Sequence, residues 1–579
     1  MKLILPKLSG NSILAWDCSS RAKHTRKGIV AIIMLLLLCV LSPLAANQAR
    51  IYPVDSEVYQ ALRQLYVAQG LSLPSTAGPW SQDELLAMVD RVDESTLSPK
   101  AIPTYEFILD KLSLKLSPFS MGASVAAEGY LHSNTTDFTA NDDWYYNHDK
   151  RKALLSLPME MALAGHFYGF ADLELTLGKY DNSSSFPVEG DSPLYGKSLL
   201  TTNMQVSGQV DANVPYRAFG AWGGTGWLLQ VGRDKLSWGP GTTGNFILGS
   251  HVQYHNQGRF TAYSDTFKYT FVTSFFPHPD EIWDLSIEDK GQARALVGLK
   301  MFMAHRFEWR LFGDRVGLAL NEAIMYQPQN GVFDLRILNP MMLYHNYFIR
   351  SDANSIASLE FDIALAPYWN LYGQLAIDEL SFGPTEWNFP VKKRHPDGVA
   401  YMLGFEYARP MAKGILFGSL EGVYTDPYLY LRSIDGDKSQ KVVTPGEEGR
   451  DSLNFVIALR RWFSEGLIYD QDFIGYRYGG DAIVGNLEVG YKQYASWSLS
   501  THLFFMLHGS LDMQSLWTIG DIRRTPTGDT KAYIDAGISG SWNITPSLEG
   551  YAGFDLLCKV ASWEPSFDGQ LYLGMQYSL

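Results

Sequence analysis

The densest group of residues able to do chemistry lies in the run Gly232–Gly241, with the sequence Gly-Arg-Asp-Lys-Leu-Ser-Trp-Gly-Pro-Gly. An indole ring beside a charged pair can hold a sugar ring by stacking and hydrogen bonding. The Gly-Pro-Gly step predicts a tight turn, because glycine adopts backbone conformations closed to other residues. A structural turn beside an ion pair in a wall of strands is the favoured alternative. The candidate residues here are Arg233, Asp234, Trp238, Gly239, Pro240 and Gly241.

A second set of candidates carries carboxylate, amide or imidazole groups on or near the polar faces of predicted strands. Paired carboxylates can act as acid and base on a glycosidic bond when they lie a few ångströms apart. The sequence does not give those distances, and charge lining a water-filled interior is the favoured interpretation. These residues are Glu322, Asn339, His345, Asp378 and Glu379.

Signatures of known enzyme classes are incomplete in this sequence. His251 and His255 are four residues apart, as in a zinc-protease helix, but Val252 stands where the catalytic glutamate belongs and the segment has no helical pattern. Ser539 begins a nucleophile-elbow pattern, but Ser541 stands where glycine is needed. We therefore expect no enzyme, no metal site and no cofactor. A hydrolase with serine and histidine far apart in sequence stays open as an alternative.

The elements that position these residues are predicted to be strands. From about residue 119, hydrophobic residues alternate with polar ones, for example in 359–365, 371–378 and 487–491. No second helical layer is predicted to cover such a sheet, and a closed barrel removes the open edges that lipid does not tolerate. At about 10 residues per spanning strand, roughly 16–20 strands would fit. We predict a mainly β protein with an antiparallel transmembrane barrel over 119–579.

The two ends of the chain carry further signals. The final strand alternates up to Leu579, as in the C-terminal signal read by barrel-assembly machinery, although phenylalanine is usual at the last position. Residues 1–49 have the features of a signal peptide with a long n-region: basic residues, a short apolar run and then small residues. A retained anchor, or a lipoprotein modified at Cys39, are the alternatives.

Residues 50–118 have a helical pattern instead. Apolar positions in 55–69 recur at helical spacing before Gly70, and Ser81 and Glu84 form a capping box. A third apolar-periodic stretch begins at Pro103. We predict a small domain of about three short helices.

The composition argues against a nucleic-acid-binding protein and favours a membrane protein over a soluble one. The net charge of −14 argues against a nucleic-acid partner, which requires basic patches. Charged residues make up 19% of the chain, below the ~25% usual for soluble domains, and aromatic residues reach 13%. This balance favours an outer-membrane barrel over a secreted, soluble all-β protein. Two of the three cysteines precede residue 50, so the exported chain has no cysteine pair for an internal disulfide.

At these clusters the sequence resembles the Wzi family of capsule-assembly outer-membrane proteins. Glu322 and five short segments in a fixed order carry the resemblance. The segments are 52–59, 232–250, 304–307, 339–345 and 372–379. The resemblance implies a helical bundle that closes the periplasmic side of an 18-stranded barrel in the bacterial outer membrane. It also implies a lectin-like, non-enzymatic role in retaining capsular or another surface polysaccharide, with outer-membrane lipid and the barrel-assembly machinery as further partners.

Two other functions stay open from the residues themselves. One is a porin or solute channel, for which the acidic balance would favour cations. The other is an outer-membrane hydrolase, suggested by the histidines and acids on the predicted polar faces.

Overall fold

A computed structural model gives the structure of residues 47–579, apart from residues 115, 139–142, 144, 148–149, 177–200, 205–210, 213–215, 278–298, 327–338, 340–343, 345–352, 381–394, 432–453, 464–465, 514 and 519. The predicted signal peptide and His345 therefore lie outside the described residues. None of the described helices is long and apolar enough to span a membrane.

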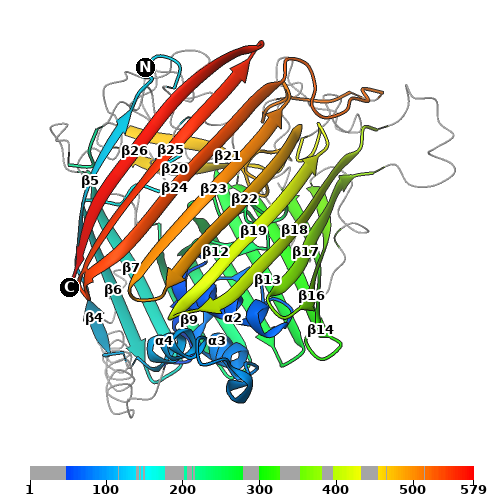
Figure 1. The fold of residues 1–579 in the computed structure, drawn as a ribbon. Coiled ribbons are helices and arrows are strands. Elements are labelled where there is room, and N and C mark those ends of the chain that lie inside the picture. Colours follow the sequence, from blue (N-terminus) through cyan, green and yellow to red (C-terminus); the bar gives the residue numbers. More distant parts are fainter. Residues whose placement is uncertain are drawn as a thin grey trace, which may run out of the picture.

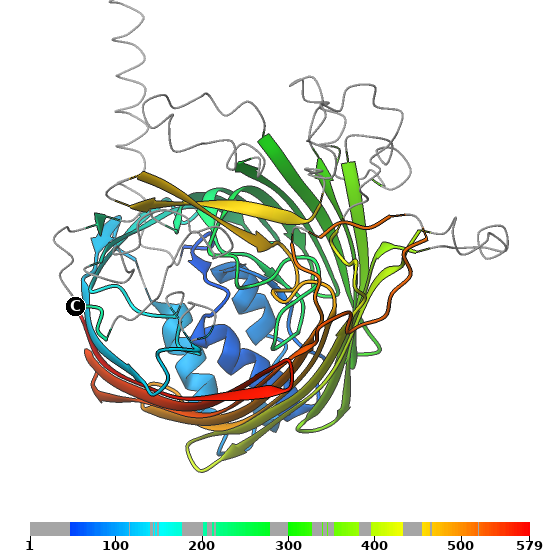
Figure 2. The same cartoon turned by 90° about the horizontal axis from the view of Figure 1, so that it is seen from above.

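The strands close into one antiparallel barrel (Figures 1 and 2). Twenty segments form the closed sheet, and two of them, β4 and β8, are short pieces of strands that continue as β5 and β9, which leaves eighteen strands. The barrel is closed by β26 against β5, with Leu573 opposite Gly129. The segments are β4 (Phe119–Met121), β5 (Ser124–His132), β6 (Leu155–Leu163), β7 (Phe167–Thr176), β8 (Asp211–Ala212), β9 (Ala218–Gly224), β10 (Trp227–Asp234), β12 (His255–Tyr263), β13 (Phe267–Pro277), β14 (Leu299–Leu311), β15 (Val316–Tyr326), β16 (Ala353–Ala366), β17 (Trp369–Glu379), β18 (Gly398–Met411), β19 (Gly414–Thr425), β22 (Ala482–Gln493), β23 (Trp497–His508), β24 (Lys531–Thr545), β25 (Leu548–Ala561) and β26 (Glu564–Ser578).

The two ends of the barrel differ in the length of their connections. At one end, here called the short-turn end, consecutive strands are joined by tight hairpin turns. Ala164, Ala412 and Ala495 have positive φ angles there, as such turns require. At the other end, the long-loop end, the connections include 133–154, 235–254, 426–481 and 509–530. The turn at Ser562–Trp563 is a short connection at this end, and it forms the tip of the β25–β26 hairpin at the top of Figure 1.

The predicted alternation of faces is confirmed by the burial of neighbouring residues. On β19, Leu420 is exposed on the outside and Glu421 is buried inside, and on β25 Leu556 and Asp555 behave in the same way. Exposed tryptophans gather near the short-turn end, as in the aromatic girdles of membrane barrels; they are Trp222, Trp369, Trp497 and Trp542. A closed barrel with an apolar outer belt and a polar interior is built to sit in lipid, and the protein is an outer-membrane β-barrel.

The predicted helices form and lie inside the barrel at the short-turn end, where Figure 2 shows them within the ring of strands. We call residues 47–114 the plug. Gly70 ends α2 in the left-handed conformation, with φ 73°. The Ser81 hydroxyl accepts the Glu84 N–H at 3.2 Å and so caps α3. The plug elements are β1 (Ile51–Tyr52), α2 (Glu57–Gln69), β2 (Ala77–Gly78), β3 (Trp80–Ser81), α3 (Gln82–Val89), η1 (Glu94–Thr96) and α4 (Ile102–Ser113).

The plug is bonded to the wall on several sides. Arg63 of α2 forms an ion pair with Glu406 of β18 at 2.9 Å. Five strands away around the wall, Lys268 of β13 donates to the Ser75 hydroxyl at 2.8 Å and pairs with Glu84. Because these strands are far apart around the barrel, the contacts hold the plug in one position.

A separate hairpin, β20 (Val456–Phe463) with β21 (Gly466–Phe473), runs across one side of the long-loop end (Figure 2). Its start is fixed to the wall by Lys300 of β14, which donates to the Asn454 side chain at 2.8 Å and to the Val456 carbonyl at 2.7 Å.

Candidate functional site in the lumen and at the long-loop end

The connection 235–254, which contains the Ser-Trp-Gly-Pro-Gly part of the candidate run Gly232–Gly241, turns into the barrel. We call it the inner loop. Within it, β11 (Ser237–Trp238) pairs with β2 of the plug, so that Trp238 lies opposite Ala77. The Trp238 N–H also donates to the Leu248 carbonyl at 3.1 Å. A connection from the long-loop end therefore reaches the plug in the middle of the lumen.

One buried carboxylate anchors this loop to the wall. Glu421 of β19 accepts the backbone N–H groups of Thr242 and Thr243 at 2.7 and 2.8 Å, and the Tyr372 hydroxyl at 2.8 Å. From the plug, the Arg63 guanidinium donates to the Pro240 carbonyl at 2.8 Å. Hydrogen bonds to a charged acceptor are among the stronger ones in proteins, so this arrangement fixes the turn.

The glycines of the cluster are explained by this packing. Gly239 has φ 130°, and a Cβ there would lie 2.0 Å from the Gln374 amide nitrogen. A Cβ on Gly241 would lie 2.0 Å from the Gly244 carbonyl oxygen. A larger residue fits at neither position without moving the wall or the loop.

The charged and aromatic members of the cluster are also engaged in structural contacts. Trp238 is completely buried, so the predicted stacking of its ring on a sugar is wrong for this structure: no face of the indole is exposed. Asp234 is buried and accepts from Arg217 at 2.7 Å and from Gln230 at 2.8 Å. Arg233 donates to the Asn256 side chain at 3.0 Å. The favoured alternative, a turn beside a wall ion pair, describes this arrangement.

The second set of predicted residues is dispersed. Glu322 accepts the Tyr344 N–H at 3.0 Å and lies 3.0 Å from His305. Asn339 is exposed. The two adjacent acids take different surroundings: Asp378 accepts the Tyr430 N–H at 2.8 Å, and Glu379 is half-exposed.

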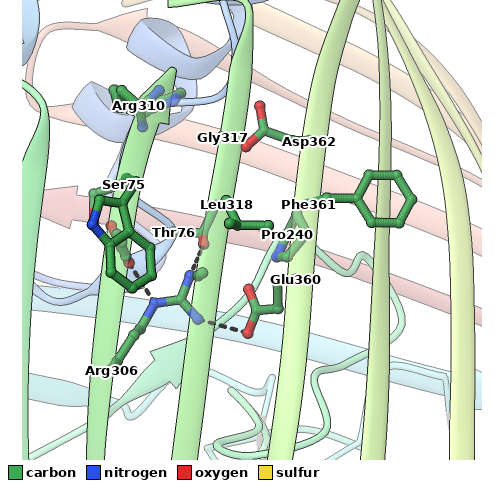
Figure 3. Close-up of a pocket in the computed structure, with 14 residues that line it drawn as sticks. Ser75, Thr76, Pro240, Arg306, Arg310, Gly317, Leu318, Glu360, Phe361 and Asp362 are labelled. Atoms are coloured by element: carbon green, nitrogen blue, oxygen red, sulfur yellow. Dashed lines mark hydrogen bonds and ion pairs between the residues drawn. The ribbon is translucent and has the colours of Figure 1, made fainter.

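A buried ionic network joins the plug to the wall at Arg306 of β14. Arg306 lies in the piece 304–307 that carries the family resemblance, but none of the network's residues is among the candidate site residues. Arg306 pairs with Glu308 of the same strand and with Glu360 of β16, the latter at 2.6 Å. It also donates to the Thr76 hydroxyl of the plug at 2.8 Å (Figure 3). The adjoining cavity of about 30 Å³ has room for water molecules but not for a sugar ring.

Apolar packing fills the space between these polar contacts. One continuous cluster of buried side chains runs from the plug through the inner loop to the connections of the long-loop end; it includes Leu62, Ile108, Trp238, Phe246, Tyr430 and Phe455. Packed side chains thus join the plug to the inner loop and to the described connections of the long-loop end inside the barrel.

A second group of aromatic residues lies where the connection 133–154 folds against the wall. The Tyr146 hydroxyl donates to Glu128 of β5 at 2.7 Å, and its ring stacks on Tyr572 at 3.9 Å. Burial, followed by the nearby Glu128 carboxylate, raises the pKa of the Tyr146 hydroxyl well above its ordinary value, so this hydroxyl stays a donor. The ring of Tyr145 lies below the ammonium group of Lys150, at 3.5 Å. The sequence signal for this group is the aromatic run 144–146.

At the tip of the β25–β26 hairpin, Trp563 is 95% exposed. It places an exposed aromatic ring at the long-loop end, whereas Tyr145 and Lys150 lie inside the barrel against His502.

No protein-family model and no curated protein matches the chain. Among solved structures, it is similar to Wzi of Escherichia coli, described as an outer-membrane, carbohydrate-binding β-barrel involved in group 1 capsule assembly. The match covers 91% of this chain and 99% of that chain, with 14% identity and a TM-score of 0.55. The chain therefore has a Wzi-like fold.

Two further solved structures match less closely. OprD of Pseudomonas aeruginosa has 8% identity and a TM-score of 0.35, over 80% of this chain and 95% of that chain. A loop-deletion variant of OmpT of Vibrio cholerae has 7% identity and a TM-score of 0.32, over 80% and 99%.

Proposed function

We propose that this protein is a non-enzymatic, lectin-like member of the Wzi group that holds capsular or another surface polysaccharide on the outer membrane. The observation that carries the proposal is the packing of the plug, the inner loop and an apolar cluster inside the barrel. The plug, the inner loop and the apolar cluster between them occupy the path along which a porin would conduct. A ligand of polymeric size then has the outer end of the barrel as its binding surface.

The orientation follows from the connections. Outer-membrane barrels carry short turns on the periplasmic side and longer loops outside. The long-loop end therefore faces outward in this proposal, and the plug faces the periplasm. The likeness in fold to a carbohydrate-binding barrel supports the same assignment.

The chemistry of the long-loop end suits a glycan. Sugar rings present C–H faces that pack on aromatic rings, and hydroxyl or acidic groups that pair with cations and carboxylates. Trp563 offers an exposed ring at the outermost hairpin, and Lys150 and Lys559 are cations on the same side of the barrel.

Replacing Trp563 with alanine is expected to weaken binding of surface polysaccharide roughly fivefold, the equivalent of about 1 kcal/mol for one stacked ring. The measurement is binding of polysaccharide, extracted from the producing cells, to the purified full-length protein in detergent micelles. Folding should be unchanged, because the side chain contacts little of the protein.

Phe312 is the matched control. It is 79% exposed, has a positive φ like Trp563, and lies in a turn at the opposite, short-turn end. Phe312→Ala should bind as the wild type does. Equal losses of binding in both variants, or no loss in either, would show that Trp563 is not part of the binding surface. A wild-type protein that does not bind the polysaccharide would contradict the proposed function.

A further inference from the structure

Three metal-ligating side chains converge on the inner face of the barrel, on neighbouring strands. His502 lies on β23, Asp535 on β24 and Asp555 on β25. The His502 Nε2 atom is 3.1 Å from a carboxylate oxygen of Asp535 and 3.5 Å from one of Asp555. One ligand atom from each residue can be chosen so that all three lie within 4.8 Å of one another. No metal site is expected here from the sequence alone.

A glycine makes this convergence possible. Gly537 lies opposite His502 on one neighbouring strand and opposite Asp555 on the other. A Cβ at this position would lie 2.0 Å from an Asp555 carboxylate oxygen and 2.3 Å from the His502 ring. The space that the three ligands share is therefore space that any other residue at 537 would fill.

One ligand oxygen has no partner among the described residues, although the Lys150 ammonium also acts on Asp555. Asp535 has an exposed fraction of only 7%, and its Oδ1 atom has no hydrogen-bond partner among the described residues. A buried carboxylate oxygen without a partner is costly. Glu488, opposite His502 on β22, adds a third acid to this part of the wall.

A second His–Asp pair in the same barrel shows the contrast. Asp568 lies 3.2 Å from His132. Its Oδ1 atom accepts the backbone N–H groups of Ser133 and Asn134 at 2.9 and 2.8 Å, and its Oδ2 atom also accepts from Gln570 at 3.0 Å. The Asp568 carboxylate is therefore satisfied by protein donors without an ion.

We propose that His502, Asp535 and Asp555 bind a divalent transition-metal ion, with Zn²⁺ as the ion that fits best. At metal–ligand distances of about 2.0–2.2 Å, neighbouring ligand atoms lie roughly 3–3.5 Å apart, as His502 and the two carboxylates do. Zn²⁺ accepts imidazole nitrogen and carboxylate oxygen together, and three protein ligands leave one position for water. The dication offsets the excess of acids.

The ion would also act on the long-loop end. The Tyr145 ring stacks on His502, with centroids 4.3 Å apart. Fixing the imidazole fixes the surface on which the connection 133–154 rests. This inference stands on the wall residues and does not depend on the proposed polysaccharide binding.

The test is Zn²⁺ titration of the full-length protein, purified without a histidine tag, treated with chelator and followed by calorimetry. We expect one ion per chain, and at least tenfold weaker binding in His502→Gln and in Asp535→Asn. His132→Gln, which alters the other His–Asp pair with Asp568, should bind Zn²⁺ as the wild type does. X-ray absorption at the zinc edge of the loaded wild type should show nitrogen and oxygen neighbours with an imidazole contribution.

Three results would overturn the proposal. They are wild-type binding no stronger than that of His502→Gln, an equal loss in His132→Gln, and an absorption spectrum without an imidazole ligand. Heat-dependent gel migration of each variant shows whether the barrel has formed, so that a loss of binding by a folded variant is distinguished from misfolding.

Discussion

Deletion of residues 50–115 is expected to convert a silent barrel into a conducting one. The deletion removes the helices inside the short-turn end, and with them the strand partner of the inner loop at Ala77–Gly78. It also removes Arg63, which bonds to both Glu406 and the Pro240 carbonyl. Lumen acids that lose their basic partners would favour cations. The measurement is single-channel conductance in planar bilayers, with the full-length protein as the silent control.

The deletion variant must first be shown to fold, by a shift in gel migration between unheated and boiled samples. Two outcomes would contradict this prediction. Conductance by the intact protein would mean that the plug does not seal the lumen. Silence of a folded deletion variant would mean that the inner loop and the outer connections seal it without the plug.

Replacing Arg306 with methionine is expected to lower the free energy of unfolding by about 3–5 kcal/mol. The reason is the burial of its partners. Glu308 and Glu360 lie with Arg306 inside the barrel. Without the guanidinium, Glu360 loses its cationic partner and Glu308 keeps only the more distant Lys268 ammonium. The loss also breaks the bond to Thr76 and so loosens the plug. Urea unfolding of the protein in lipid vesicles measures the change.

Two further variants separate charge burial from packing. In the triple variant Arg306→Met, Glu308→Gln and Glu360→Gln, the buried charges are removed together, and most of the stability should return. Arg523→Met breaks an exposed pair with Asp521 at 2.9 Å, and should cost no more than about 1 kcal/mol. A single variant as stable as the wild type would show that the network does not hold the plug to the wall.

Local pattern accounts for most of the fold. Alternation in 359–365 and 487–491 places leucines outside and acids inside, and β16 and β22 confirm it. The helix signals were equally local: Gly70 caps α2, and Ser81 caps α3. Each of these features depends on residues within a few positions of one another, which is why the sequence alone predicts them.

The site depends on contacts that local pattern does not contain. The turn at Gly239–Gly241 was predictable, but its burial was not, because Glu421 and Ala77 are more than a hundred residues away in sequence. The cluster of His502, Asp535 and Asp555 takes one residue from each of three strands. A register shift of one residue would turn any of them to the outer face, so only the paired structure shows that they meet.

The central claim, that the barrel retains polysaccharide at its outer end, is tested most directly on cells. The measurement is the ratio of cell-bound to released surface polysaccharide in a strain lacking the gene, and in the same strain complemented with the wild-type gene. We predict that deletion shifts polysaccharide from the cell surface to the medium while total synthesis stays constant, and that complementation reverses the shift. An unchanged ratio in the deletion strain would contradict the account.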